Sequence, residues 1–189
     1  MARSAAVILA SGSPQRRALL ERLNLDFTVR VSDAPELEQG EPAWVAIENA
    51  LRKARAVARP GAHELVIGCD TIVVLDGRIY GKPPDAAAAR RTLKALAGRT
   101  HEVLSGLAVL APEVPERTAL ARTEVTFREL GARQLDRYVA IGEWLGRSGG
   151  YAIQGAGAKL VRAVAGEEEN VVGLPLTTLL ELCPELRPR

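Results

Sequence analysis

Strand-like and helix-like patterns of apolar residues alternate along the first half of the chain. The apolar runs at Ala5–Ala10, Phe27–Val31 and Glu64–Leu75 predict strands, and the last of them is rich in the β-branched residues that favour strands. Between these runs, Pro14–Leu23 and Ala43–Ala58 carry apolar residues at helical spacing and predict amphipathic helices. Such alternation is typical of the α/β class, in which helices cover a sheet.

The second half of the chain adds a hairpin and more strands. Asp76-Gly77 is a strong two-residue turn signal, so Arg78–Tyr80 is expected to fold back on the preceding strand. The remaining patterns predict helices at Asp85–Ala97, Ala132–Ile141 and Leu176–Cys183 and strands at Glu102–Leu110, Thr118–Phe127 and Lys159–Val164. The sequence has no repeat and no linker, which predicts one α/β domain over residues 1–189. We expect a mixed, twisted sheet flanked by helices, with two lobes around a central cleft.

Composition and charge argue against several classes of function. The net charge is +2 and aromatic residues make up 4%, so the chain lacks the basic, aromatic-rich stripe of nucleic-acid-binding proteins. No apolar stretch approaches the length of a membrane span, and we expect no membrane partner. Cys69 and Cys183 form no disulfide framework, which favours the reducing cytoplasm. His63 and His101 are far apart in sequence, which disfavours a zinc site.

A turn of small residues joins the first predicted strand to the first predicted helix. Ser13 suits the N-cap, and Pro14 suits the first helical position because it has no N–H to lose there. The turn gathers free backbone N–H groups at the positive end of the helix dipole, a geometry that binds anions, and Arg16 and Arg17 add positive charge. From this segment alone, a phosphate site and an ordinary capped helix with solvated arginines are both open interpretations.

Asp70 interrupts the otherwise apolar strand at 64–75. A carboxylate among buried residues is costly unless it is paired, hydrogen-bonded or metal-bound, so a functional role is favoured over a solvent-facing bend. Lys82 follows the predicted hairpin and could aim its ammonium group back at Asp70. Lys53 lies at the border of the apolar face of its helix, where it either extends past the core edge or projects into a cleft.

A glycine-rich loop at 149–158 is the third candidate segment. Its glycines allow backbone N–H groups to approach a ligand closely, and Tyr151 and Gln154 add side chains that could read the edge of a base. Taken alone, this composition is more typical of a plain tight loop. Asn170 precedes the last predicted helix, where it would cap the helix or contact a ligand. Cys69 is a poor candidate nucleophile because nothing in the sequence suggests that a histidine lies beside it to activate the thiol.

Together these segments resemble the Maf family of nucleoside triphosphate pyrophosphatases over nearly the whole chain. The matching motifs, in the family's order, are Leu9-Ala10-Ser11-Gly12-Ser13-Pro14 with Arg16, Lys53-Ala54, Asp70-Thr71, Gly81-Lys82-Pro83, His101-Glu102-Val103, Tyr138-Val139, Gly142-Glu143, Gly150-Tyr151-Ala152-Ile153-Gln154-Gly155 and Asn170-Val171-Val172-Gly173-Leu174-Pro175. Several motifs in one order are far more specific than any single motif, and they favour the phosphate interpretation of the first turn.

The resemblance implies a fold, an activity and a set of site residues. The fold is an elongated α/β structure with a central cleft, similar to inosine triphosphate pyrophosphatases and often a homodimer. The activity is hydrolysis of a nucleoside triphosphate to the monophosphate and pyrophosphate with Mg²⁺ or Mn²⁺, which cleans the nucleotide pool. Asp70 would be the general base or the metal-linked residue that activates water. The triphosphate would be held by Ser11, Ser13, Arg16, Lys53 and Lys82. Glu36 or Glu38 could share the metal, and our prediction names Glu38 beside Asp70.

Three positions bear on which nucleotide is the substrate. Family members that act on dTTP and UTP resemble this chain at Thr71 and Gln154 but carry arginine in place of Gln15. Members that act on 7-methyl-GTP usually carry tryptophan there and different residues at the other two positions. Two of the three positions therefore predict dTTP/UTP specificity. A 7-methyl-GTP-type enzyme is one alternative, and a nucleotide-binding regulator of septum formation with little catalysis is another. Arg147 stands where the family often has lysine, which keeps the charge but not the geometry.

Overall fold

The structure, a computed structural model, describes residues 5–187. Its strands are β1 (Ala6–Leu9), β2 (Phe27–Val29), β3 (Glu64–Leu75), β4 (Arg78–Tyr80), β5 (Thr100–Leu110), β6 (Arg117–Phe127) and β7 (Val161–Ala165). Its α-helices are α1 (Pro14–Glu21), α2 (Pro42–Val57), α3 (Ala86–Leu96), α4 (Ala132–Ile141), α5 (Glu168–Val172) and α6 (Leu176–Leu182). Short 3₁₀ turns are η1 (Ser148–Gly150), η2 (Gly155–Lys159) and η3 (Pro184–Leu186). The predicted domain over 1–189 also includes residues 1–4 and 188–189, which lie outside the described residues.

The predicted elements are present, and most boundaries move by one or two residues. The prediction for Lys159–Val164 is wrong at its start, because Gly155–Lys159 forms η2 and β7 begins only at Val161. Helix α5 was not predicted, because its 5 residues are too few to show a helical period. The first helix ends at Glu21, two residues before the predicted end at Leu23.

All strands belong to one seven-stranded sheet with the order β2-β1-β3-β5-β6-β7, and β4 pairs with β3 outside this path. Strands β1, β2 and β3 are parallel, whereas the β3–β4, β3–β5, β5–β6 and β6–β7 pairs are antiparallel. Parallel pairing follows from the helical crossovers between the first three strands. Hairpins supply the β3–β4 and β5–β6 pairs, whereas the β3–β5 and β6–β7 pairs are connected through α3 and α4. The predicted mixed sheet in an α/β fold is therefore confirmed.

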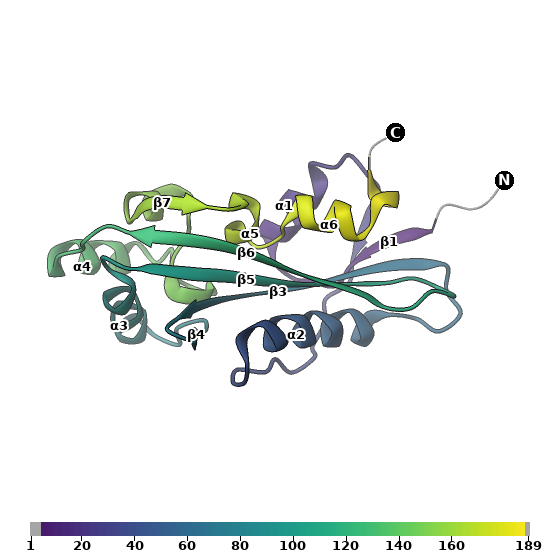
Figure 1. The fold of residues 1–189 in the computed structure, drawn as a ribbon, viewed down its shortest axis with the longest axis horizontal. Coiled ribbons are helices and arrows are strands. Elements are labelled where there is room, and N and C mark those ends of the chain that lie inside the picture. The colour runs from purple at the N-terminus through teal and green to yellow at the C-terminus, as the bar shows by residue number, and fades with distance from the viewer. Residues whose placement is uncertain (1–4, 188–189) are drawn as a thin grey trace.

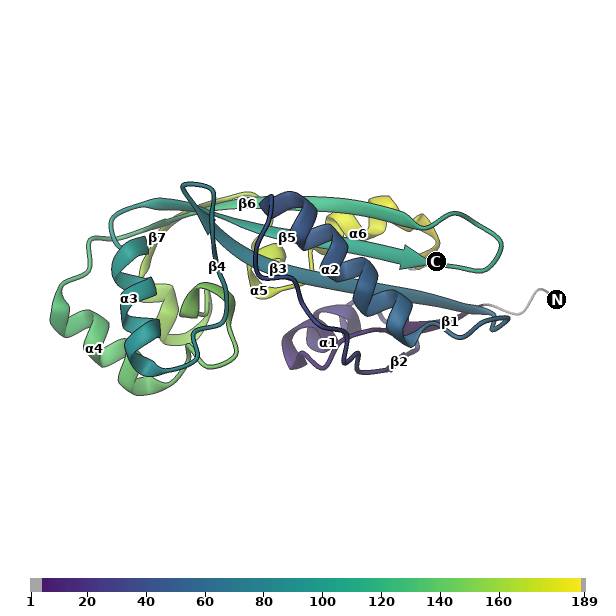
Figure 2. The same cartoon turned by 90° about the horizontal axis from the view of Figure 1, so that it is seen from below.

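Helices cover the sheet unevenly and give the elongated molecule two lobes (Figure 1). Helix α2 lies along one face, and α1 and α6 cover the other face near one end. Helices α3 and α4 lie at the opposite end, separated from α1 by the middle of the sheet (Figure 2). Each lobe has its own apolar cluster, one containing Leu9, Leu20 and Leu179 and the other Leu93 and Phe127. In residues 5–187, no helix combines the length and the hydropathy that crossing a membrane requires.

One edge of β3 is left without a strand partner in the middle of the molecule. Strand β1 pairs with β3 as far as Leu9 opposite Ile67, and β4 pairs with it from Tyr80 opposite Val73. Among the described residues, no strand pairs with this edge of β3 between those two points. Side chains alternate between the two faces of a strand, so both faces of β3 can present side chains at this gap.

Two glycines let α2 lie directly on the sheet beside the gap. A Cβ atom on Gly68 would lie 2.2 Å from the carbonyl oxygen of Ala50, and one on Gly106 would lie 2.1 Å from that of Ala46. Any larger residue would force the helix away from β3 and β5. Gly106 is also the cross-strand partner of Asp70. The absent side chains therefore bring α2 within hydrogen-bonding reach of Asp70.

Candidate active site

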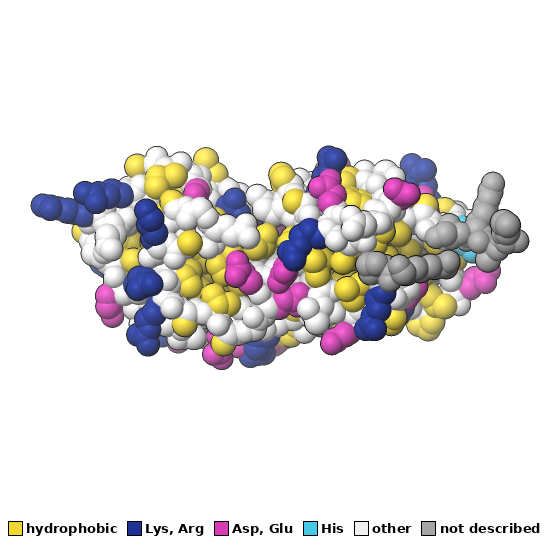
Figure 3. Space-filling view, turned by 90° about the horizontal axis from the view of Figure 1, so that it is seen from above, with side chains coloured by type: hydrophobic (Ala, Val, Ile, Leu, Met, Phe, Trp, Pro, Cys, Tyr) yellow, Lys and Arg dark blue, Asp and Glu magenta, His cyan; other side chains and the backbone are white. Residues whose placement is uncertain are grey.

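A cavity of about 870 Å³ opens at the gap in the sheet edge. It is lined by the β1–α1 turn, the loop before α2, α2 itself, β3, the segment after β4, and the loops around residues 143–155 and 171–173. In Figure 3 it corresponds to the notch in the outline between the two lobes. The volume is within the usual range of small-molecule sites, about 300–1,000 Å³. The predicted cleft between two lobes is thus present.

Arg16 is fixed at the cavity by partners from three segments. Ser13 caps α1 as predicted, since its Oγ accepts the Arg16 backbone N–H at 3.4 Å, and the Ser13 N–H donates to Ser11 Oγ at 3.2 Å. The Arg16 guanidinium donates to Ser11 Oγ at 3.2 Å, to Thr71 Oγ1 at 3.3 Å and to the Gly173 carbonyl at 2.9 Å. The turn therefore brings one guanidinium group and the start of a helix to the same point, as an anion site requires.

Asp70 lies on the α2 face of β3 and is only 4% exposed. One carboxylate oxygen accepts from Lys53 Nζ at 2.5 Å, and the other accepts from Asn49 Nδ2 at 3.0 Å. Lys53, itself 8% exposed, also pairs with Glu36 at 2.7 Å. Of the two interpretations of Lys53, the structure therefore favours projection into the cleft.

Glu36 links the two lobes across the cavity. It lies in the loop before α2 and pairs with Lys82, which follows β4 in the other lobe, at 3.2 Å as well as with Lys53. Burial opposes ionisation of this carboxyl group, but hydrogen bonds and charges from Lys53 and Lys82 hold its pKa below the ordinary value. Asn49 exchanges two hydrogen bonds with the backbone of Leu37 at 2.7 and 3.0 Å, which fixes this loop.

The second predicted metal ligand, Glu38, does not lie at the cavity. Glu38 is exposed and absent from the lining, whereas Glu36 is part of it and shares Lys53 with Asp70. In residues 5–187, no group of three or more His, Cys, Asp or Glu side chains could hold a metal by itself. Mg²⁺ is commonly held by one or two carboxylates together with substrate phosphates, and the Glu36–Asp70 pair fits that donor set.

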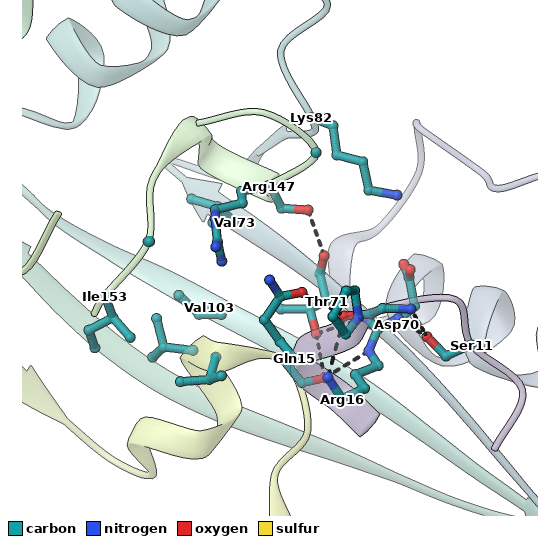
Figure 4. Close-up of a pocket in the computed structure, with 18 of the residues that line it drawn as sticks. Ser11, Gln15, Arg16, Asp70, Thr71, Val73, Lys82, Val103, Arg147 and Ile153 are labelled. Atoms are coloured by element: carbon teal, nitrogen blue, oxygen red, sulfur yellow. Dashed lines mark hydrogen bonds between the residues drawn. The ribbon is translucent and has the colours of Figure 1, made fainter. Parts of the chain in front are cut away.

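The predicted specificity residues lie at different points of the cavity. Thr71 projects from the face of β3 opposite to Asp70 and, besides Arg16, contacts Ser105 Oγ at 2.8 Å. Gln15 accepts from Ser13 Oγ at 3.0 Å. Gln154 is exposed at the cavity rim. Figure 4 shows Thr71 and Gln15 near the centre of the cavity, with Lys82 and Ser11 on one side and Arg147 and Ile153 on the other.

An aromatic cluster supports the wall formed by Tyr151. The Tyr151 hydroxyl lies 2.8 Å from His101 Nε2, and both rings pack edge-on against Phe127. Burial lowers the pKa of His101 to about 4, so the imidazole is neutral at pH 7. Burial also raises the pKa of the Tyr151 hydroxyl. Both groups therefore hold the wall in place rather than exchange protons.

Glu143 fixes the glycine-rich loop and was not predicted as a site residue. Its carboxylate accepts the backbone N–H groups of Ala156 at 2.9 Å and Gly157 at 3.0 Å, and its carbonyl accepts from Arg147 Nε at 2.8 Å. Asn49 was likewise missed. It lies four residues before Lys53, hence on the same helix face, which is the signal that could have found it.

Asn170 and Cys69 belong to the scaffold. Asn170 is fully buried and donates to the Val103 carbonyl at 3.0 Å and to Thr123 Oγ1 at 3.1 Å, so it anchors α5 to the sheet. Cys69 is fully buried, and burial raises the pKa of its thiol. This agrees with the expectation that Cys69 is no nucleophile.

Comparison with known proteins shows the family. The profile described as "Maf-like protein" matches residues 6–186. A dTTP/UTP pyrophosphatase from Moorella thermoacetica is 50% identical over 179 residues, covering 93% of this chain and 92% of that protein. One from Bacillus cytotoxicus is 46% identical over 175 residues, covering 92% and 91%. The Staphylococcus aureus Ham1 structure shares 17% identity over 65% of this chain and 71% of its own, with a TM-score of 0.49, too low to support a conclusion. On its sequence relatives, the chain belongs to the Maf family.

Proposed function

We propose that this protein hydrolyses dTTP and UTP to the nucleoside monophosphate and pyrophosphate. The observation that carries the proposal is Asp70, a nearly buried carboxylate held by Lys53 and Asn49 at the floor of a cavity whose other cations are suited to phosphate. Relatives 46–50% identical to this chain are named for this activity. Removal of excess or modified nucleotides from the pool is the cellular role that fits the chemistry.

The cations of the cavity are placed to hold the triphosphate. Arg16 and the N-terminus of α1 lie on one lobe, and Lys82 approaches from the other. Lys53 and Lys82 both pair with Glu36 in this structure, so their ammonium groups already lie close together. Phosphate oxygens would accept hydrogen bonds from these groups and from Ser11 and Ser13. Fixed cations of this kind stabilise the negative charge that collects on a departing pyrophosphate.

Asp70 acts on the attacking water in this proposal. The water oxygen forms a bond to the α-phosphorus, the bond from that phosphorus to the bridging oxygen breaks, and pyrophosphate leaves. Asp70 orients the water and accepts its proton, while Asn49 and Lys53 keep the carboxylate in place. Glu36 and Asp70 would hold a divalent cation together with the substrate phosphates. Mg²⁺ or Mn²⁺, when bound, would neutralise phosphate charge and polarise the water.

The test is hydrolysis by an Asp70→Asn variant. The amide keeps the size of the carboxylate, and Lys53 retains Glu36 as a partner, so the variant is expected to fold. Loss of a general base should lower kcat by about 100-fold or more. The measurement is release of pyrophosphate from UTP and dTTP with Mg²⁺ and with Mn²⁺. Asp26→Asn, at an exposed position away from the cavity, is the matched control.

Two outcomes would contradict different parts of the proposal. Undiminished hydrolysis by Asp70→Asn would remove Asp70 from the reaction. A wild-type protein that binds UTP but releases no pyrophosphate with either metal would favour a nucleotide-binding regulator. The homodimer and the cytoplasmic location expected from the sequence stay predictions.

A further inference from the structure

Arg147 is a cavity-lining arginine that the proposed mechanism does not use. Its Nε donates to the Glu143 carbonyl at 2.8 Å, which fixes the plane of the guanidinium group. Within residues 5–187 no carboxylate forms an ion pair with it. Arg30, in contrast, pairs with Glu64 at 2.8 Å. Arg147 thus presents terminal N–H donors to the cavity without an acidic partner.

The surroundings of Arg147 differ from those of the phosphate-binding cations. Figure 4 shows its guanidinium on the side of Val103 and Ile153, while Lys82, Asp70 and Ser11 lie on the far side of Thr71. Val73, Tyr151 and Val171 also line the cavity. Apolar walls suit the faces of a nucleobase, and the opposite side already supplies the cations that a triphosphate needs. Arg147 is therefore placed at the end where the base would lie.

Hydrogen-bonding capacity separates Arg147 from its neighbours at this end. The Thr71 hydroxyl is already bonded to Arg16 and Ser105, and the Tyr151 hydroxyl to His101. The amides of Gln15 and Gln154 can both donate and accept, so each can reorient to match either a keto oxygen or an amino group. Arginine only donates. Of the described polar side chains at the base end, Arg147 is thus the one that can favour a keto oxygen over an exocyclic amino group.

We propose that Arg147 is a specificity-determining residue, whose guanidinium donates to the 4-keto oxygen of uracil or thymine and disfavours the 4-amino group of cytosine. This rests on the proposed function, because it assumes that the base enters the apolar end of the cavity. Glu143 is its positioning residue. The backbone carbonyl of Glu143 orients the Arg147 guanidinium, and the carboxylate of Glu143 holds the loop that carries Gln154. Substrate choice between two pyrimidines then depends on one donor.

The experiment compares kcat/KM for UTP and CTP in the wild type and in Arg147→Gln. Glutamine replaces a donor-only group by one that can also accept, so the UTP/CTP ratio should fall about tenfold or more. Arg147→Lys restores a donor-only group without the planar fork and should keep part of the preference. Arg137→Met, at an exposed position on α4 outside the cavity lining, should leave the ratio unchanged.

The outcomes separate this inference from the proposed function. If Arg147→Gln lowers kcat/KM for UTP and CTP by the same factor, Arg147 contacts phosphate and the inference is wrong. Unchanged kcat/KM values for both nucleotides would also contradict the inference. If the wild type hydrolyses neither nucleotide, the proposed function fails, and calorimetric binding of UMP and CMP then decides the role of Arg147. A thermal unfolding curve like that of the wild type shows that Arg147→Gln is folded, and the Arg147→Lys ratio carries the comparison if it is not.

Discussion

The two ends of the cavity, which we propose to bind the phosphates (the phosphate end) and the base (the base end), are built in opposite ways. At the phosphate end, Lys53, Asp70 and Glu36 satisfy one another in an ion-paired network, and Arg16 is held by three oxygen atoms. At the base end, Arg147 has no acidic partner among the described residues, and the Gln154 side chain is exposed at the rim.

This contrast indicates that the phosphate end mainly supplies binding and the base end mainly supplies selectivity for the base. Paired charges keep the side chains of the phosphate end in place before substrate arrives, and phosphate and a cation would take over some of these partners. Donors without protein partners at the base end gain a hydrogen bond only from the right base, so they contribute discrimination. Stability should therefore respond mainly to changes at the phosphate end, and substrate choice mainly to changes at the base end.

The largest change in stability should distinguish the two lysines of the phosphate end, Lys53 and Lys82. Lys53→Met removes the ammonium from the nearly buried Asp70 and should lower the free energy of unfolding by about 3–5 kcal/mol. Lys82→Met removes a half-exposed partner of Glu36 and should cost about 1 kcal/mol or less. Urea unfolding of both variants measures the difference. Equal losses would mean that burial of the pair does not matter.

A smaller effect concerns the wall of the base end, and it depends on pH. Because burial lowers the pKa of His101 to about 4, the unfolded chain binds a proton between pH 6.5 and 4 that the folded protein does not. Stability therefore falls as the pH falls through this range. Between pH 7 and pH 5 the loss should be about 2 kcal/mol, and His101→Gln should lack it. Urea unfolding at both pH values measures this. A His101→Gln protein that loses as much as the wild type would assign the loss to other groups.

The smallest effect on stability is expected at the rim. Gln154→Ala removes an exposed side chain that has no hydrogen-bond partner among residues 5–187, so the free energy of unfolding should change by no more than about 0.5 kcal/mol. Loss of one hydrogen bond to the base should raise KM for UTP by about 2- to 10-fold with little change in kcat. Steady-state kinetics with pyrophosphate release separates the two constants. A fall in kcat at constant KM would place Gln154 in the reaction rather than in base binding.

The sequence predicts much of this fold because its elements carry strong local signals. β3 was predicted with its observed bounds, since the β-branched run ends at the Asp76-Gly77 turn. Asp85, where the predicted helix begins, caps α3, because its Oδ1 accepts the Ala88 N–H. The wrong or missing predictions concern segments in which apolar residues show no helical or strand period. Neither the 3₁₀ turn at Gly155–Lys159 nor the short α5 is long enough for a pattern.

The candidate site was harder to predict because its partners are far apart in the chain. Asp70 stood out as a charge in an apolar strand, but nothing local distinguishes Glu36 from Glu38 in a loop without periodicity. Glu36 reaches Lys53 because Asn49 fixes the loop at Leu37, and α2 lies close to the sheet because of Gly68 and Gly106, and none of these contacts can be recognised locally in the sequence. The roles assigned to these residues stay predictions until the variants are measured.

The strands that run beneath both lobes have a mechanical consequence. β3 and β5 are 12 and 11 residues long, and each contributes side chains to the apolar clusters of both lobes. In the described chain the lobes are joined by these continuous strands and not by loops alone, so they have no loop hinge about which to rotate apart. Widening the cavity requires the continuous strands to twist, and the stiffness of the sheet opposes that twist. The size of nucleotide that the protein admits is then limited by the elasticity of its sheet as well as by the side chains that touch the ligand.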